Sequence, residues 1–227
     1  MSAFQSRVPK SSAPPLAAIV ASVTGGQVAM RTDEPVVDDE IEARPFPDGG
    51  YLAVAASLCG GRSYAALEGF FRQVAGQVFG LEPGRLFQTL NRLAAEAPAG
   101  AHGLRCEPWF YGTRHREDLR ASITGATAGN FTPGHLARAV LEGIAGSLHG
   151  GYAALRRHRG PAQTVVGAGN GLRENPLLTD LVAAEFGRPM LRSAHREEAA
   201  YGAALLAAVG AGVQPDLASA GRLIRYV

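Results

Sequence analysis

Cysteine is scarce in this sequence: only Cys59 and Cys106 occur, far apart and without CxxC or Cys/His spacing. That scarcity argues against a zinc site and against a disulfide framework. Isolated buried thiols pack as small hydrophobes, so we expect both side chains in the core. Without a disulfide framework or a recognisable signal peptide, the expected location is the cytoplasm.

An excess of charge of one sign is also lacking, because 22 basic and 20 acidic residues leave a formal net charge of +2. Without a basic stripe, neither nucleic acid nor an anionic membrane is an expected partner. The longest apolar run, "AAYGAALLAAVGAGV" from Ala199, is shorter than the roughly 18–20 residues that span a bilayer. We predict a buried helix there, whose small face of Ala199, Gly202, Ala203 and Ala207 packs beneath a glycine turn.

The sequence nevertheless has what a folded domain needs, since 46% of its 227 residues are apolar. Residues 1–15 are rich in Ser and Pro and predict a disordered lead-in, so we place one ordered domain at 16–227. Short apolar runs alternate with amphipathic stretches, which predicts an α/β fold. The expected strands lie near 16–22, 26–31, 51–57, 164–167 and 189–192.

Three local patterns add to this outline. The acidic segment 33–48 lacks the DxDxDG spacing of a calcium loop, so we expect a solvated loop and no metal ligands. The only tryptophan, Trp109, lies in the strand-like stretch "LRCEPWFYG" and is expected in the core. The clearest helix follows Thr132 and Pro133, a cap and a first helical residue, with apolar residues at every fourth position from 136 to 148.

The stretch "VVGAGNGLRENPLL", residues 165–178, is a glycine turn that could hold a ligand. A dinucleotide loop needs GxGxxG opening a helix, and an acid about 20 residues later. Here Leu172 replaces the third glycine, Asn175 and Pro176 delay the helix start, and the next strand, "PMLRS", carries no acid. The interpretation of the chain as an NAD-type oxidoreductase is therefore supported by the glycines alone. An adenine lying on bare backbone and a turn without ligand are the other interpretations.

Three stretches in this order resemble the C-terminal lobe of the FGGY carbohydrate kinases: "GNFTPGHLARAVLEGIAGSL", "VVGAGNGLRENPLLTDLVAAEFGRP" and "REEAAYGAALLAAVG". The family's signature of small and apolar residues is present at Ala121, Ile123 and Gly125 and again from 135 to 142, with Ala126 in place of a larger aliphatic residue. Within the family, "FPDGGYLAVAASLCGG" and "FYGTRH" look most like the sedoheptulokinase branch.

The resemblance implies an actin-like, ribonuclease H-like ATPase lobe, with a mixed sheet flanked by helices, that holds ATP against an N-terminal sugar-binding lobe. The residues implied at the adenine are Gly169, Asn170, Arg173 and Asn175. The residues implied at the phosphates are Thr24, Gly25, Gly60 and Gly61. Mg²⁺ would enter through the phosphates, in a complete enzyme only.

The family's catalytic aspartate, just upstream of the phosphate hairpin, has no counterpart, because the first acid of the sequence is Asp33. Phosphoryl transfer to a sugar needs a carboxylate to take the hydroxyl proton, so we assign no catalytic residue and expect the chain alone to be inactive. Val23 also replaces a glycine of the phosphate turn, which predicts that adenine dominates nucleotide binding. Two interpretations stay open: an ATP-side lobe completed by a missing N-terminal lobe or partner chain, and a non-catalytic remnant that binds nucleotide.

Overall fold

A computed structural model describes residues 17–22, 25–114 and 116–227, so the predicted lead-in lies outside the described residues. The fold is α/β and is built on a six-stranded mixed sheet of order β3-β4-β2-β1-β7-β8. Its strands are β1 Ala17–Ser22, β2 Gly26–Thr32, β3 Glu42–Pro45, β4 Tyr51–Ser57, β7 Thr164–Ala168 and β8 Met190–Arg192. All five strands expected from the sequence are therefore confirmed. A separate two-stranded sheet joins β5 Arg105–Glu107 to β6 Ser122–Thr124.

The sheet is antiparallel on one side of β1 and parallel on the other. The β1–β2 hairpin and the pairs β2–β4 and β3–β4 run antiparallel, whereas β7 lies parallel to both β1 and β8. In the register Ala18↔Met30 and Val20↔Val28, all four residues are buried on one face of the sheet. Their side chains alternate with outward-facing ones such as Ile19, which is 42% exposed.

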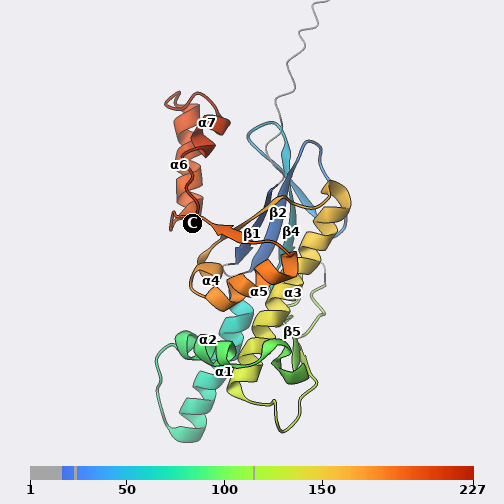
Figure 1. Cartoon of the computed structure of the whole chain (residues 1–227), viewed down its shortest axis with the longest axis vertical. Coiled ribbons are helices and arrows are strands. Elements are labelled where there is room, and N and C mark those ends of the chain that lie inside the picture. The colour runs from blue at the N-terminus through green and yellow to red at the C-terminus, as the bar shows by residue number, and fades with distance from the viewer. Residues whose placement is uncertain (1–16, 23–24, 115) are drawn as a thin grey trace, which may run out of the picture.

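Helices cover the buried face and extend beyond it (Figure 1). They are α1 Gly61–Phe79, α2 Phe87–Glu96, the 3₁₀ helix η1 Ala99–Gly103, α3 Pro133–Arg159, α4 Asn170–Arg173, α5 Pro176–Phe186, α6 Glu198–Gly210 and α7 Leu217–Gly221. The longest, α3, packs on β2 and β4, and also contacts α2, η1 and β5 where it extends past the sheet. As predicted, Thr132 caps it by accepting a hydrogen bond from His135 N, and Pro133 is its first residue. Its residues Leu136, Val140, Ile144 and Leu148 are all buried.

The C-terminal helix α6 differs from its prediction. It forms over the expected residues, but none of them is buried, and Figure 1 shows α6 and α7 standing away from the sheet. Ala199, Ala203 and Ala207 are exposed instead of packing beneath the glycine turn. The helix α6 carries apolar residues on all of its faces, so the sequence pattern cannot show which face would be covered. Within the described part of the chain, no helix has the length and apolarity needed to cross a membrane.

Two other predictions were wrong in part. The acidic segment is not a simple solvated loop, because Glu42–Pro45 form the edge strand β3 and several of its acids are ion-paired. Trp109 is only partly buried, because it follows the short strand β5 and lies in a loop that passes over α3. Both cysteines are buried and free as expected, and burial raises the pKa of Cys106 to about 11.

Candidate nucleotide site

Two glycine turns meet at one edge of the sheet. Strands β1 and β7 are parallel neighbours with Ala21 opposite Ala168, so both end at the same edge. A Cβ added at Gly171, in α4, would lie 2.6 Å from the backbone oxygen of Ser22 and 2.7 Å from its hydroxyl. The turn after β7 therefore lies directly against the end of β1, and only glycine allows that approach.

The glycine turn after β7 begins a helix earlier than predicted. Gly169, with φ of 87°, is the N-cap of the single helical turn α4, which is closed by a hydrogen bond from Arg173 N to Gly169 O. The helix then breaks at Asn175, because a residue before proline avoids helical backbone angles. The longer helix α5 starts at Pro176, as the sequence indicated.

A cavity of about 290 Å³ opens beside this turn. It is lined by Gly167, Ala168, Gly169, Leu172, Arg173, Arg192, Ser193, Ala194, Arg196, Glu198 and Val227. The guanidinium of Arg173 donates to the backbone oxygens of Arg196 at 2.7 Å and His195 at 2.9 Å, and it also pairs with Glu198. The cavity lining thus combines glycine and alanine with three arginines, of which Arg173 is held in place by hydrogen bonds, an arrangement that suits a flat polar ring.

The two predicted asparagines differ in position. Asn170 is exposed at the start of α4, and Arg173 Nη1 lies 3.5 Å from its Oδ1. Asn175 is buried and does not line the cavity: it accepts a hydrogen bond from Leu178 N and donates one to Asn91 Oδ1 at 3.0 Å. Its amide therefore holds the start of α5 against α2.

The second turn, between β1 and β2, lies against the loop that joins β4 to α1. A Cβ at Gly60 would lie 2.5 Å from the backbone carbon of Gly25, and a Cβ at Gly25 would lie 2.8 Å from Ser57 O. Gly60 precedes α1 and Gly61 is its first residue, so the structure brings three predicted phosphate-site residues together. Residues 23 and 24 lie outside the described part of the chain, and Thr24 with them.

A cavity of about 320 Å³ adjoins the second turn. Its lining residues are Ala21, Gly25, Gly26, Gln27, Ala56, Ser57, Leu58, Arg62 and Arg114. Sequence reasoning missed both arginines, because they come from α1 and from the loop after β5, and no local motif joins them. It also missed Ser22, whose fully buried hydroxyl lies between the two turns and has no hydrogen-bond partner among the described residues.

Three of the acids that follow the hairpin form ion pairs with arginines. Asp33 and Asp48 both pair with Arg31, and Glu42 pairs with Arg44 and Arg114. The Arg44 guanidinium, hydrogen-bonded to Glu42, holds the pKa of that carboxyl below its usual range. Within residues 17–22, 25–114 and 116–227, no cluster of three His, Cys, Asp or Glu side chains could hold a metal ion.

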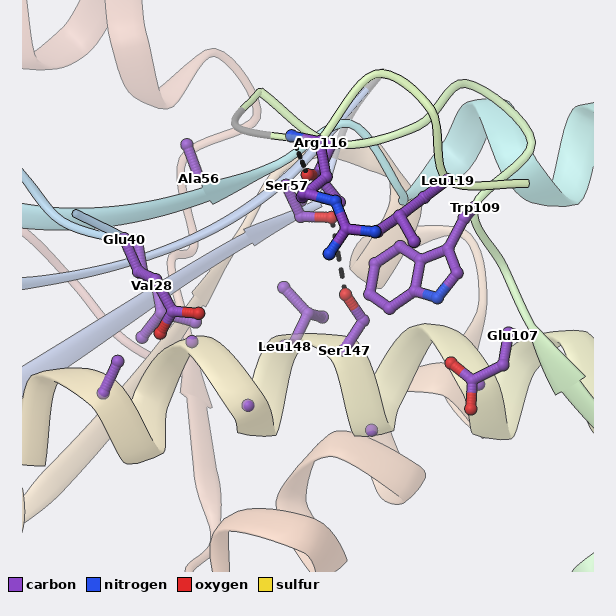
Figure 2. Close-up of a pocket in the computed structure, with 18 of the residues that line it drawn as sticks. Val28, Glu40, Ala56, Ser57, Glu107, Trp109, Arg116, Leu119, Ser147 and Leu148 are labelled. Carbon is purple, nitrogen blue, oxygen red and sulfur yellow. Dashed lines mark hydrogen bonds between the residues drawn. The ribbon is translucent and has the colours of Figure 1, made fainter. Parts of the chain in front are cut away.

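A third cavity, of about 590 Å³, lies between α3, the sheet and the loop after β5 (Figure 2). Trp109, Leu119 and Arg116 close it on the loop side, and Ser57 Oγ faces Ser147 Oγ at 3.4 Å across it. Arg116 is already paired with Asp118 through two hydrogen bonds of 2.9 Å. This cavity shares Gly26, Ala56 and Ser57 with the one beside Gly25 but is lined on its other side by α3.

Comparison with known proteins identifies a family. Residues 21–211 match the FGGY family of carbohydrate kinases, C-terminal domain. The chain is 30% identical to sedoheptulokinase from Mus musculus over 188 residues, which are 83% of this chain and 39% of that protein. A glycerol kinase from Alkalilimnicola ehrlichii is 33% identical over 84% of this chain and 38% of its own length. The chain thus spans about two fifths of the length of these relatives.

Solved structures show the same fold. The xylulose kinase from Rhodospirillum rubrum superposes with a TM-score of 0.78 at 25% identity, over 94% of this chain and 42% of that one. The Plasmodium falciparum glycerol kinase with ADP has a TM-score of 0.69 at 22% identity, over 91% of this chain and 40% of its own. The predicted actin-like, ribonuclease H-like architecture, a mixed sheet flanked by helices, is confirmed.

Proposed function

The chain belongs to the FGGY family of carbohydrate kinases, as the C-terminal domain of that family, and on this premise we propose that it is the ATP-binding lobe of a sedoheptulokinase-like sugar kinase. The reaction would transfer a phosphoryl group from ATP to a sugar hydroxyl. The lobe would occupy residues 16–227 after a lead-in of 1–15. The sugar site and the proton-accepting carboxylate would lie in an N-terminal lobe outside this sequence. The proposed location of the protein is the cytoplasm.

The observation that carries this proposal is the meeting of two glycine turns at one sheet edge, each beside its own cavity. We propose that adenine lies over Gly169, with Arg173 beside it and Asn170 at the rim. The phosphates would reach toward Thr24, Gly25 and Gly60, while Gly61 begins α1. Asn175 would support the turn from below and not touch the base. The likeness to a glycerol kinase with ADP supports a nucleotide ligand.

Bare backbone is what such a ligand requires. A Cβ atom at Gly25, Gly60 or Gly171 would lie only 2.5–2.8 Å from neighbouring backbone atoms, so only glycine fits at these positions. Mg²⁺ would arrive with the phosphates in a complete enzyme, since Asp33 and Glu42, which follow the hairpin, are already paired with arginines.

Calorimetric titration of the purified chain with adenosine, ATP and NAD⁺ tests the nucleotide site. We expect adenosine and ATP to bind and to compete with each other, and NAD⁺ to bind no more tightly than adenosine. Absence of binding by both adenosine and ATP would contradict the proposal. Much tighter binding of NAD⁺ would favour an oxidoreductase.

An ADP-release assay with sedoheptulose tests the catalytic half of the proposal. The chain alone should show no sugar-dependent turnover, because losing a general base typically costs about 10²–10⁴ in rate even before the sugar site is counted. Addition of a separately expressed N-terminal lobe should restore it. Nucleotide binding without turnover in both conditions would favour the non-catalytic remnant, which Val23 and the missing aspartate also support.

A further inference from the structure

We propose that Arg62 and Arg114 form a two-arginine site that binds the terminal phosphates of the nucleotide. This inference rests on the proposed function and adds the residues that would recognise the phosphate charge. Both side chains line the cavity of about 320 Å³ beside Gly25 and Gly26. They come from different parts of the fold, the first turn of α1 and the loop after β5, and so converge on this cavity only in the folded chain.

Arg62 is positioned by an aromatic ring. Its Cζ lies 3.9 Å from the centre of the Tyr111 ring, a stacking distance. Among the described residues it forms no ion pair with a carboxylate. A stacked guanidinium keeps its N–H groups in the ring plane available to an oxyanion, and the stack fixes the plane before the ligand arrives.

Arg114 shares its carboxylate partner, Glu42, with Arg44. Its Nη1 lies 2.5 Å from Glu42 Oε1, while Glu42 Oε2 accepts hydrogen bonds from Arg44 Nη2 at 2.6 Å and Nε at 3.1 Å. One negative charge thus faces two guanidinium groups. With Arg62 nearby, positive charge exceeds negative charge at this end of the cavity, which favours a multiply charged anion.

The position of the cavity points to nucleotide phosphates as the anion. Ser22, which ends β1, follows Ala21 of the cavity lining and contacts Gly171 of α4, next to the turn at Gly169. A ligand with its base over Gly169 can therefore extend along the sheet edge to the arginines. Val23 alone predicted binding dominated by adenine; the arginines supply charge that the altered turn does not, so affinity should rise with phosphate number.

The test is titration of adenosine, ADP, ATP and tripolyphosphate into the wild type, Arg62→Ala and Arg114→Ala, without added metal ions. Arg72→Ala is the matched control, because Arg72 is an exposed arginine further along α1 that does not line this cavity. We expect ATP to bind more tightly than ADP and adenosine in the wild type. Each cavity variant should lose about tenfold or more in ATP affinity, the loss typical of a charge-assisted hydrogen bond, with adenosine unchanged.

Arg62→Lys separates charge from geometry. It keeps the cation but loses the planar fork, so it should recover part of the ATP affinity that Arg62→Ala loses. Equal binding of ATP and adenosine by the wild type, with adenosine still bound, would overturn the two-arginine site and leave the proposed function standing. Unchanged ATP affinity in both alanine variants would also overturn it. Tripolyphosphate binding tightly in the absence of adenosine binding would overturn the nucleotide as the source of the anion.

Discussion

Among single residues, Gly169 is the one on which the proposed adenine contact depends most. Its φ of 87° is in the left-handed region, and the cavity floor is its bare backbone. We predict that Gly169→Val abolishes adenosine and ATP binding, because a branched side chain would occupy the place of the base. Titration calorimetry measures the loss.

A control is needed for the backbone strain that Gly169→Val introduces at a positive φ. Gly212 has a similar φ of 73°, lies away from the cavity, and has no heavy atom within 4 Å of an added Cβ. Gly212→Val should therefore lower stability by a comparable amount, on the order of 1–3 kcal/mol for a strained backbone position, while binding adenosine normally. Equal loss of binding in both variants would mean that strain, and not the cavity, explains the result.

Gly60 tests the contact between the phosphate hairpin and the start of α1. An alanine there would place Cβ 2.5 Å from Gly25, so we predict that Gly60→Ala lowers the free energy of unfolding by about 1–3 kcal/mol through overpacking. Gly69→Ala, in the same helix with open space around it, should instead raise stability by about 0.5–1 kcal/mol. Urea denaturation measures the free energy of unfolding of both variants. Equal changes would show that the hairpin does not pack closely against Gly60.

How much of the site the sequence could reveal differs from residue to residue. Gly25 and Gly60 were predicted from the family resemblance, and Gly169 also from the glycine turn itself, where the lack of a Cβ has a direct steric meaning. Asn175 was predicted beside the adenine, but a cap and a ligand contact use the same amide, and the structure shows this amide bonded to Leu178 N and Asn91. No local sequence pattern marks Arg62, because its partner Tyr111 is distant in the chain.

Among the elements, the helices α3 and α6 differ most clearly in how far their apolar side chains are buried. Leu148 of α3 is 2% exposed, whereas Leu206 of α6 is 43% exposed although its helix is more apolar. We predict that Leu148→Ala costs about 2–5 kcal/mol of stability and that Leu206→Glu changes it by no more than about 0.5 kcal/mol. Thermal unfolding of the isolated chain measures both. A large loss in Leu206→Glu would show that α6 packs against the domain in solution.

Elements with a strong hydrophobic period were predictable and those without one were not. The strands β1, β2 and β4 carry runs of apolar residues, and α3 has its cap and a regular apolar face. Strand β3, "EARP", has no such pattern because it is a short edge strand that pairs with β4 alone. The single turn α4 is too short for any helical period to be visible.

For the whole molecule, the α/β class followed from alternating patterns, but the mixed strand order did not. That order depends on β7 returning beside β1 after the 27-residue helix α3, a contact between segments more than 100 residues apart. The pattern also could not predict that Ile19, Leu191 and α6 stay uncovered. Exposed apolar side chains of this kind are what the second lobe proposed above would cover.

The central claim is that ATP binds at the edge where the two glycine turns meet, and photo-cross-linking with 8-azido-ATP tests it most directly. The reactive group is on the adenine, so the modified residues, mapped by mass spectrometry, mark where the base lies. We predict labelling within residues 164–175 that excess ATP removes and that Gly169→Val lacks. ATP-sensitive labelling confined to another region, such as the cavity beside Trp109, would contradict the account.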